Sequence, residues 1–324
     1  MTDAMDVQEA SGGGVSAGVR CRDLSTVHEP LGGLFKPVKE PADWRHFKLS
    51  QEQVDQFWRD GYLTNIPVLS EEQCDKILLD YQRLIEDNDR FPGIDMMYEF
   101  HCNQTNDPHN VLLHCLGHWR LTPSFHDVCF IPSIAVPASQ LLDPHQERRV
   151  RLWHDQLFGK PPHYGGNVAW HQDYSYWTRT TPMAHLTIHI ALDAQTLDNG
   201  GLQYIPGSHR WTRDGAPLPV TDFNFKDMES IQTILTEDEK VAFKPVHALL
   251  KKGEASLHHP LTVHGSKPNR SEYSRRACVV NYIADGVCSN TDEPLLEGTN
   301  LIKKGDKMEG QFYPLIYDPA WSRG

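Results

Sequence analysis

The sequence is poor in the features that mark membrane proteins and nucleic-acid-binding proteins. Its longest apolar stretch, near residues 130–142, is interrupted by Pro132 and Pro137 and falls short of the ~20 residues that a membrane-spanning helix needs. Positive charge is also scarce, because the formal net charge is -12 and no basic patch of useful size stands out. Such a protein repels phosphate backbones and anionic membrane surfaces. We therefore expect no membrane segment and no nucleic-acid partner.

Paired cysteines are absent as well. The seven cysteines are odd in number, widely scattered and without a C-x-x-C pair, which disfavours a disulfide scaffold or a structural zinc site. The first 18 residues carry neither the apolar stretch of a signal peptide nor the Arg-rich pattern of a transit peptide. These absences predict a reducing compartment and a cytoplasmic location. No feature of the sequence calls for an obligate protein partner.

The composition of the chain is that of an ordinary globular protein. Its 324 residues are 39% hydrophobic and 23% charged, enough for one large domain with a substantial core. Residues 1–45 are rich in glycine and proline and predict a flexible or loosely docked N-terminal arm, followed by one domain over residues 46–324. Ser50 with Gln53 forms a capping box that predicts a helix ending at Gly61, and Ser70 opens a second helix.

From Val150 onward the hydrophobic period becomes that of strands. In residues 185–192, one face of a strand would carry His185, Thr187, His189 and Ala191, and the other Leu186, Ile188, Ile190 and Leu192. This division predicts a mostly β fold in which one sheet face lines a polar interior and the apolar face is covered by helices.

A short motif at residues 170–174, WHQDY, has the residue types of a metal site. On a strand, His171 and Asp173 would share a face and present a nitrogen and an oxygen to one point. One remote histidine would complete the two-His, one-carboxylate triad that holds iron(II) and leaves its opposite face open. Taken alone the motif is weak, because a His and an Asp two residues apart occur often by chance.

Two downstream segments strengthen it: GGLQYIPGSH at 200–209, and HGSKPNRS at 264–271 followed by Arg275 and Arg276. In the order and spacing of these motifs the chain resembles the phytanoyl-CoA dioxygenase family, over roughly residues 51–282. The resemblance implies a double-stranded β-helix core of the jelly-roll or cupin-like type, flanked by N-terminal helices. It also implies an iron(II)- and 2-oxoglutarate-dependent dioxygenase that consumes O2.

The resemblance further implies that His171, Asp173 and His264 bind the iron. His258, His259 and His209 compete for the place of the remote ligand. His264 is preferred because it directly precedes Gly-Ser, as the distal ligand of the family does. His209 is interpreted as a structural residue.

For 2-oxoglutarate, the family places an arginine eleven positions after the distal histidine, which selects Arg275 and turns Arg276 outward. The resemblance adds contacts from the hydroxyl of Ser266 and from Gln156. His189 stands where relatives often carry tryptophan and should face the co-substrate. For Gln156 and His189 the alternative is ordinary hydrogen bonding in the interior.

The retained carboxylate of Asp173 favours hydroxylation of a C–H bond over halogenation, with release of succinate and CO2. The substrate would be a small metabolite or an acyl-CoA, and the lack of a peroxisomal C-terminal signal disfavours direct equivalence to the fatty-acid enzyme. Two alternatives remain: a cupin-like metal-dependent hydrolase or isomerase, and a catalytically silent binding protein on the same barrel.

The walls of the substrate site are predicted from aromatic residues. Residues near the metal motif could line its mouth, and the segments 93–120 and 212–245 could cover it. The candidates are Tyr174, Tyr176, Trp177, Trp119, Trp211 and Phe223.

Overall fold

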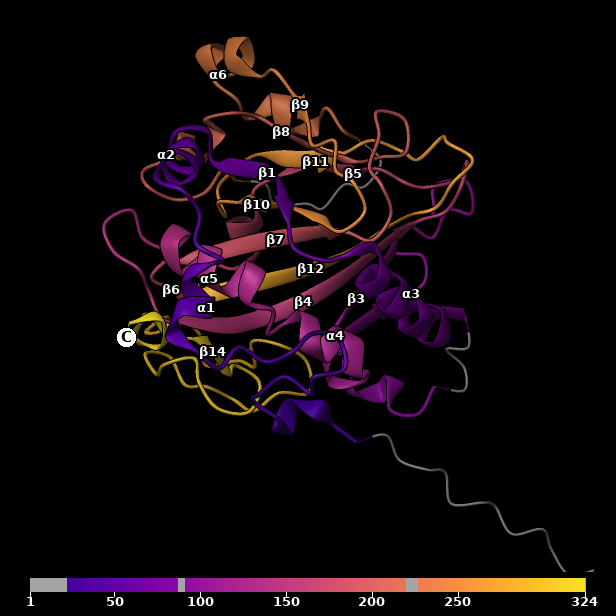
Figure 1. The fold of residues 1–324 in the computed structure, drawn as a ribbon. Helices are drawn as coiled ribbons and strands as arrows, with labels where there is room; N and C mark the ends of the chain where they lie inside the picture. The colour runs from indigo at the N-terminus through magenta and orange to yellow at the C-terminus, as the bar shows by residue number, and fades with distance from the viewer. Residues whose placement is uncertain (1–21, 87–90, 220–226, 324) are drawn as a thin grey trace, which may run out of the picture.

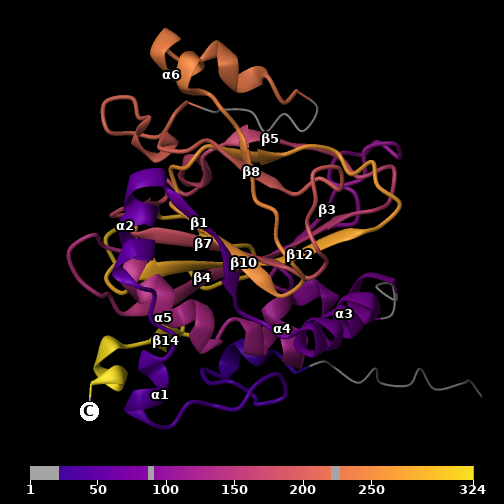
Figure 2. The same cartoon turned by 45° about the horizontal axis from the view of Figure 1, so that its top comes forward.

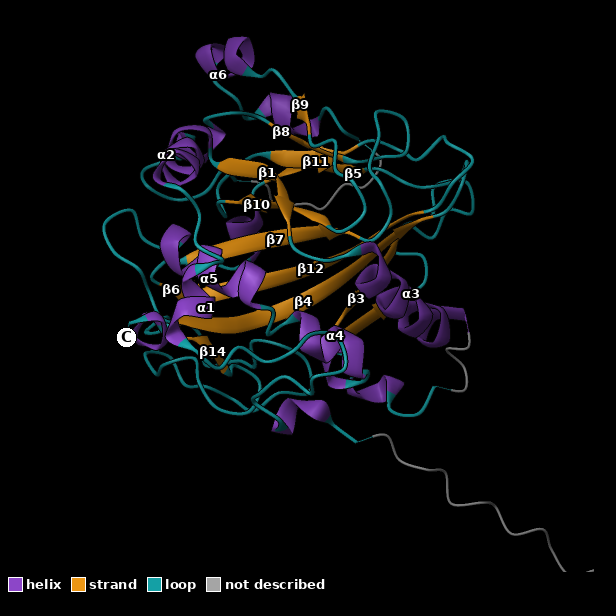
Figure 3. Cartoon of the chain, in the orientation of Figure 1, coloured by secondary structure: helices purple, strands orange, loops and turns teal. Residues whose placement is uncertain are grey.

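The computed structural model describes residues 22–86, 91–219 and 227–323, which form a mostly β fold with few helices (Figures 1 and 3). Its largest antiparallel sheet has the strand order β1-β10-β7-β12-β4-β3-β2, with β14 paired to β4. The strands are β1 (Tyr62–Pro67), β2 (Glu99–His101), β3 (Leu113–Leu116), β4 (Val150–Lys160), β7 (His185–Ala191), β10 (Glu254–His258), β12 (Arg275–Ala284) and β14 (Leu315–Tyr317).

A second antiparallel sheet has the order β5-β11-β8-β9 and forms a separate layer above the first in Figure 1. Its strands are β5 (Val168–His171), β8 (Leu202–Tyr204), β9 (Val246–His247) and β11 (His264–Ser266), and a small ribbon pairs β6 (Thr180–Thr181) with β13 (Cys288–Ser289). Two facing antiparallel sheets are the layers of a jelly roll. The predicted mostly β, jelly-roll core is confirmed.

Helices flank the large sheet, mainly from the N-terminal half of the chain (Figure 1). They are α1 (Pro41–Arg45), α2 (Gln51–Asp60), α3 (Glu71–Glu86), α4 (Pro123–Val128) and α5 (Pro132–Leu141), whereas α6 (Glu237–Ala242) lies beyond the small sheet. The predicted capping box starts α2, and Gly61 ends it with a φ of 86°, a left-handed conformation that favours glycine. Within the described residues, no helix combines the length and apolar character needed to cross a membrane.

The alternation predicted for β7 is confirmed by what its two faces touch. Leu186, Ile188 and Ile190 lie in the main hydrophobic core, which also holds Ile134 and Val136 of α5. The odd-numbered Thr187 and His189 face the interior cavity instead. The apolar face of β7 therefore packs against the helices, while its other face lines the cavity.

Residues 22–45, the described part of the predicted arm, pack against the domain. The Asp23 carboxylate accepts hydrogen bonds from Arg120 at 3.1 and 2.5 Å. Asp127 accepts the backbone N–H groups of Leu31 and Leu34, at 2.6 and 2.9 Å. Residues 1–21 lie outside the described part, and the boundary between arm and domain stays a prediction.

Candidate metal centre and co-substrate pocket

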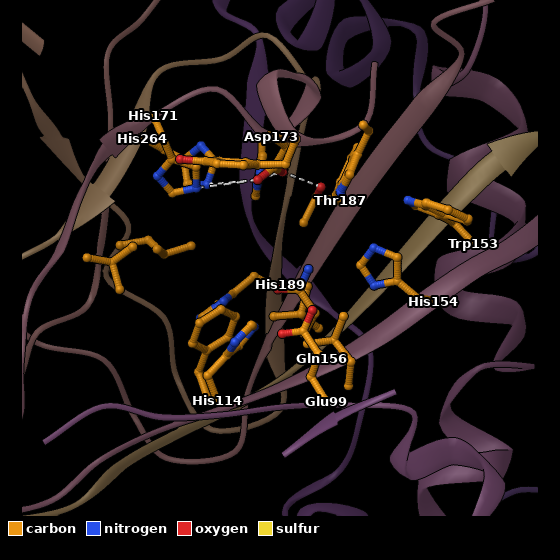
Figure 4. Close-up of a pocket in the computed structure, with 18 of the residues that line it drawn as sticks. Glu99, His114, Trp153, His154, Gln156, His171, Asp173, Thr187, His189 and His264 are labelled. Carbon is orange, nitrogen blue, oxygen red and sulfur yellow. Dashed lines mark hydrogen bonds and ion pairs between the residues drawn. The ribbon is translucent and has the colours of Figure 1, made fainter. Parts of the chain in front are cut away.

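A cavity of about 480 Å³ lies between the two sheets, and Figure 4 shows a close-up of it. The small sheet contributes the histidines of β5 and β11, and the large sheet contributes polar residues of β4, β7, β10 and β12. The volume is in the range of sites that take small organic ligands. The residues predicted for the site all line it: His171, Asp173, His264, Arg275, Ser266, Gln156 and His189.

Three of these side chains converge at one point in the upper part of Figure 4, where His171 and His264 lie to the left of Asp173. His264 of β11 pairs directly with His171 of β5 across the small sheet. The Oδ1 atom of Asp173 lies 3.5 Å from His171 Nε2 and 3.6 Å from His264 Nε2. One ligand atom from each of the three residues lies within 4.8 Å of the others, so the group could hold a metal ion.

Asp173 lies just beyond the strand that carries His171. Strand β5 ends at His171, and a short 3-10 turn begins at Asp173. Gln172 between them keeps an extended backbone, with a φ of -113° and a ψ of 129°. The two side chains therefore point to the same side, as residues two apart on a strand do.

Both histidines are oriented by their second ring nitrogen. His171 Nδ1 lies 2.8 Å from the Ala169 carbonyl oxygen, and His264 Nδ1 lies 2.9 Å from that of Thr262. A carbonyl only accepts, so each Nδ1 carries the proton and each Nε2 can offer its lone pair to a metal. Bonds of this kind commonly fix the orientation of metal-binding histidines.

The other oxygen of Asp173, Oδ2, has partners of its own. Thr187 Oγ1 donates to it at 2.6 Å, and His258 Nε2 lies 3.0 Å away. Burial raises the pKa of the Asp173 carboxyl, but the adjacent imidazoles of His264, His171 and His258 outweigh it and hold that pKa well below its usual range. The carboxylate is therefore ionised, as a metal ligand must be.

The competing histidines have other environments. His258 neighbours the three converging residues, with its ring centroid 4.3 Å from that of His264, but its Nε2 bonds Asp173 Oδ2. His209 Nε2 lies 3.1 Å from the Trp58 carbonyl, which fits the structural role expected for it. His259 packs edge-on against the ring of Trp58.

Arg275 is buried at the same cavity, 2% exposed. Its Nη2 donates to the Gly200 carbonyl at 2.7 Å, and its Nε has no partner in the structure. Gly200 has a φ of 76°, and a Cβ there would meet the Lys267 carbonyl oxygen at 2.6 Å. Only glycine therefore fits at position 200. Burial lowers the pKa of Arg275 to about 10.

Arg276 turns away and pairs with Asp193 at 2.8 Å, as predicted.

A second buried cation, Lys160, was missed in the sequence. It lies opposite Arg275 in the register of β4 and β12, and its Nζ donates to Ser266 Oγ at 2.6 Å and to the Lys267 carbonyl at 2.7 Å. Burial, with Arg275 and Arg270 nearby, lowers its pKa well below the usual range. Strand parity could have found it, because Lys160 lies four residues after Gln156, a predicted co-substrate contact, and such residues share one face of a strand.

Gln156 and His189 line the cavity and also have protein partners. Gln156 hydrogen bonds with His114, and burial lowers the pKa of that histidine to about 3. His189 Nε2 lies 2.6 Å from the amide nitrogen of Gln195. Burial, together with Arg275, holds the pKa of His189 well below its usual range, so the ring is neutral.

The predicted walls are partly wrong. Tyr176 and Trp177 line the cavity, but Tyr174 does not, since its hydroxyl donates to the Thr180 carbonyl. Trp119 is fully buried in the core, because the Asp155 carboxylate accepts its backbone N–H at 2.6 Å and holds the turn there.

The two expected covers differ. Segment 93–120 contributes Glu99, Gln104, His114 and Leu116 to the cavity. The described part of 212–245 contributes none, because its helix α6 lies beyond the small sheet, away from the large one (Figure 2). Trp211 packs with Phe243 in a separate cluster, and Phe223 lies outside the described residues. Leu295 and Leu296, for which the sequence offered no signal, complete the wall.

Solved structures share this fold. The 2-oxoglutarate-dependent carbocyclase SnoK from nogalamycin biosynthesis superposes with a TM-score of 0.66 at 21% identity, over 83% of this chain and 97% of that chain. EctD from S. alaskensis, solved with 2-oxoglutarate and 5-hydroxyectoine, gives a TM-score of 0.58 at 21% identity, over 82% of each chain. These likenesses support the jelly-roll core.

Sequence comparison supplies the family. Peroxisomal phytanoyl-CoA dioxygenase of Mus musculus is 22% identical over 261 residues, 78% of this chain and 75% of that protein. A probable alpha-ketoglutarate-dependent hypophosphite dioxygenase of Stutzerimonas stutzeri is 33% identical over 139 residues, 42% of this chain and 46% of that protein. The model of the family described as phytanoyl-CoA dioxygenase (PhyH) matches residues 57–277, well over half of the chain. The chain therefore belongs to the phytanoyl-CoA dioxygenase family and is an iron(II)- and 2-oxoglutarate-dependent dioxygenase.

Proposed function

We propose that this dioxygenase hydroxylates a C–H bond of a small-molecule substrate and that His171, Asp173 and His264 hold its iron. The convergence of their ligand atoms within 4.8 Å carries the proposal. Two imidazoles and one carboxylate on one face of an octahedral ion leave the other face for 2-oxoglutarate and O2. The carboxylate of Asp173 supports hydroxylation, since halogenating relatives of such oxygenases have a small residue in its place.

When bound, the iron lets 2-oxoglutarate and O2 react to give succinate and CO2, with the second oxygen atom passing to the substrate. The residues of the chain orient and shield this reaction. The backbone carbonyls of Ala169 and Thr262 fix the two imidazole rings. Trp177 and Leu296 are buried in the cavity wall and make that part of it apolar.

Arg275 and Ser266 are proposed to bind the distal carboxylate of 2-oxoglutarate, and Lys160 to orient the Ser266 hydroxyl through its hydrogen bond. Two buried basic side chains face each other across β4 and β12, and neither forms an ion pair with a carboxylate among the described residues. Uncompensated buried charge is costly, so the site favours an anionic ligand. Because Lys160 donates to Ser266 Oγ, the hydroxyl proton of Ser266 is available to that ligand. A metal-dependent hydrolase or isomerase has no use for such a pair.

The proposed substrate is a small metabolite without a CoA group. The cavity of about 480 Å³ must hold 2-oxoglutarate and substrate together. Arg275 lies deep, and Arg179 is the one exposed cation among the described lining residues, alongside the exposed carboxylate of Glu99. The phosphates of CoA would call for a cluster of cations at the opening.

The test combines spectroscopy with product analysis. Iron(II) and 2-oxoglutarate, mixed with the protein without oxygen, should give the weak visible charge-transfer band of the chelate. With O2 and ascorbate, a metabolite extract should yield succinate and a compound heavier by one oxygen atom. The variant His171→Ala should give neither signal.

Two results would count against the proposal. An intact protein that binds iron but gives no band with 2-oxoglutarate would refute the assigned ligands. An oxygenated acyl-CoA as the main product, with free CoA competing for binding, would refute the substrate class while leaving the iron site standing.

We also infer a cytoplasmic location for the protein. Among the described residues no cysteine forms a disulfide, and Cys74, Cys115, Cys129 and Cys278 are buried. Unpaired thiols suit a reducing compartment. Fractionation of cells that produce the protein, with an antibody to the chain, tests the inference, and recovery from a membrane-bounded organelle would refute it.

A further inference from the structure

The two oxygens of the Asp173 carboxylate have different surroundings. Oδ1 faces Nε2 of His171 and of His264, at 3.5 and 3.6 Å. Oδ2 faces away from these atoms and meets Thr187 Oγ1 at 2.6 Å and His258 Nε2 at 3.0 Å. In Figure 4 the dashed lines from Asp173 run to opposite sides, toward the histidine pair and toward Thr187.

The two partners of Oδ2 are held by the large sheet. His258 of β10 pairs directly with Thr187 of β7, so adjacent strands place both side chains over the same cavity. Both residues are buried, at 1% and 5% exposure. They therefore form a rigid pair of contacts on one carboxylate oxygen.

A chain of hydrogen bonds fixes which nitrogen of His258 donates. The Tyr204 hydroxyl lies 2.8 Å from Ser256 Oγ and 3.0 Å from His258 Nδ1. If Ser256 donates to Tyr204 and Tyr204 donates to Nδ1, then Nε2 carries the proton and donates to Asp173 Oδ2. Each donor in this chain has an acceptor, and the carboxylate receives two donors on one atom.

We propose that Thr187 and His258 are positioning residues that restrict Asp173 to one metal-binding oxygen. This rests on the proposed iron ligands. A carboxylate can bind a metal through one oxygen or through both. An octahedral ion with three protein ligand atoms keeps three positions, two for 2-oxoglutarate and one for O2. Binding through both oxygens of Asp173 would fill the position that O2 needs.

The proposal gives His258 a role that differs from that of an iron ligand. Its Nε2 is already committed to Asp173 Oδ2, which lies on the side of the carboxylate away from His171 and His264. Outer partners of this kind commonly tune a metal site without touching the ion.

The test compares four proteins as complexes with iron(II) and 2-oxoglutarate, prepared without oxygen. The double variant Thr187→Val/His258→Phe removes both donors and keeps the side-chain bulk. The variant Thr187→Ser/His258→Gln restores a donor at each position. Thr196→Val, at an exposed threonine whose hydroxyl bonds Asp198, is the matched control. Wild-type protein is the reference.

Two measurements follow the carboxylate. Crystal structures of the complexes should show one bound Asp173 oxygen in wild type and two in the double variant. The affinity for nitric oxide, used in place of O2 and titrated by electron paramagnetic resonance, should fall at least tenfold in the double variant. The restoring variant and the control should match wild type. Iron(II) affinity should stay within a fewfold of wild type, because all three ligands remain.

A double variant that keeps one bound oxygen and wild-type nitric oxide affinity would overturn the proposal. Two bound oxygens in the wild-type complex would do the same. If the double variant does not fold, Thr187→Val alone carries the test, since it removes the shorter bond. Iron found away from His171, Asp173 and His264 in wild type would instead refute the proposed function.

Discussion

Two adjacent arginines on β12 differ sharply in their surroundings. Arg275 is buried at the cavity, whereas Arg276 is partly exposed and pairs with Asp193. A charged group without an anionic partner gains most when one arrives, while a partly exposed ion pair contributes little. Arg275 is thus suited to bind the co-substrate, whereas Arg276 is suited only to its ion pair with Asp193.

We predict that Arg275→Gln weakens 2-oxoglutarate binding far more than Arg276→Gln. Loss of one partner of a buried charge-assisted pair typically costs ~2–5 kcal/mol, which is a factor of about 30 or more in affinity. Isothermal titration of 2-oxoglutarate into the anaerobic iron(II) protein measures both variants. A larger effect of Arg276→Gln would show that the assignment of these two residues is reversed.

Lys160 gives a second prediction at the residue scale. Without a bound anion, burial beside Arg275 disfavours the charged form of Lys160 and so destabilises the fold, because that form lacks water and a carboxylate partner. Lys160→Met should therefore raise the free energy of unfolding in urea while weakening 2-oxoglutarate binding at least tenfold. A variant that loses stability and binds 2-oxoglutarate normally would contradict the proposed role.

At the scale of elements, β7 supports the fold with one face and the site with the other. Ile188 is fully buried in the main core, and its neighbour Thr187 bonds Asp173. Side chains on the two faces of a strand do not share neighbours, so changes to them act separately. The stability and the chemistry of this strand are therefore open to independent tests.

Ile188→Ala should lower the free energy of unfolding by about 2–5 kcal/mol, the usual cost of a large cavity in a core. Because the change is on the helix-facing side, 2-oxoglutarate affinity of the folded variant should stay within twofold of wild type. Urea denaturation and titration calorimetry measure the two quantities. A tenfold loss of affinity at unchanged stability would contradict the division of faces.

Sequence patterns succeeded where the physical cause is local. The caps of α2, the alternation of β7 and the opposite facing of Arg275 and Arg276 depend on residues within a few positions of one another. The wall residues failed because they depend on the path of distant segments. Trp119 was expected at the cavity, yet the remote carboxylate of Asp155 holds its turn in the core. Nothing near Leu295 indicates that it reaches the site.

At the scale of the whole molecule, stability depends on pH through buried neutral histidines. His185 is 3% exposed, and its Nδ1 accepts the Ala184 backbone N–H at 3.2 Å. Burial, with His154 nearby, lowers the pKa of His185 to about 3. Above pH ~6.5 the ring is neutral in both the folded and the unfolded state, so its contribution is fully present. Below that pH only the unfolded state gains the proton, and stability is lost as the pH falls toward 3.

The metal-free protein should therefore lose stability on acidification, and His185→Gln should lose less. The difference between the two unfolding free energies should change by ~1.4 kcal/mol per pH unit below pH ~6. Urea denaturation at neutral and mildly acidic pH measures it. Parallel pH dependences of the two proteins would contradict the assigned protonation state.

Metal binding should stabilise the whole fold, because both sheets contribute side chains around the place where His171, Asp173 and His264 converge. At a free manganese(II) concentration of 100 times the dissociation constant, the gain is ~2.7 kcal/mol. Thermal unfolding should shift upward by a few degrees in wild type, and a chelator should reverse the shift. His264→Ala should show no shift; an equal shift in this variant would place the ion elsewhere.

The position of Leu295 and Leu296 in the cavity wall has an evolutionary consequence. Both lie after residue 277, where the match to the family ends, whereas the proposed iron ligands all lie within it. Mutations in this trailing segment can reshape the space available to a molecule while the reactive machinery stays intact. Such modularity fits the fact that relatives of this chain are named for compounds as unlike as hypophosphite and phytanoyl-CoA. New substrate preferences can then arise through mutations in this segment, and the enzyme stays active at each step.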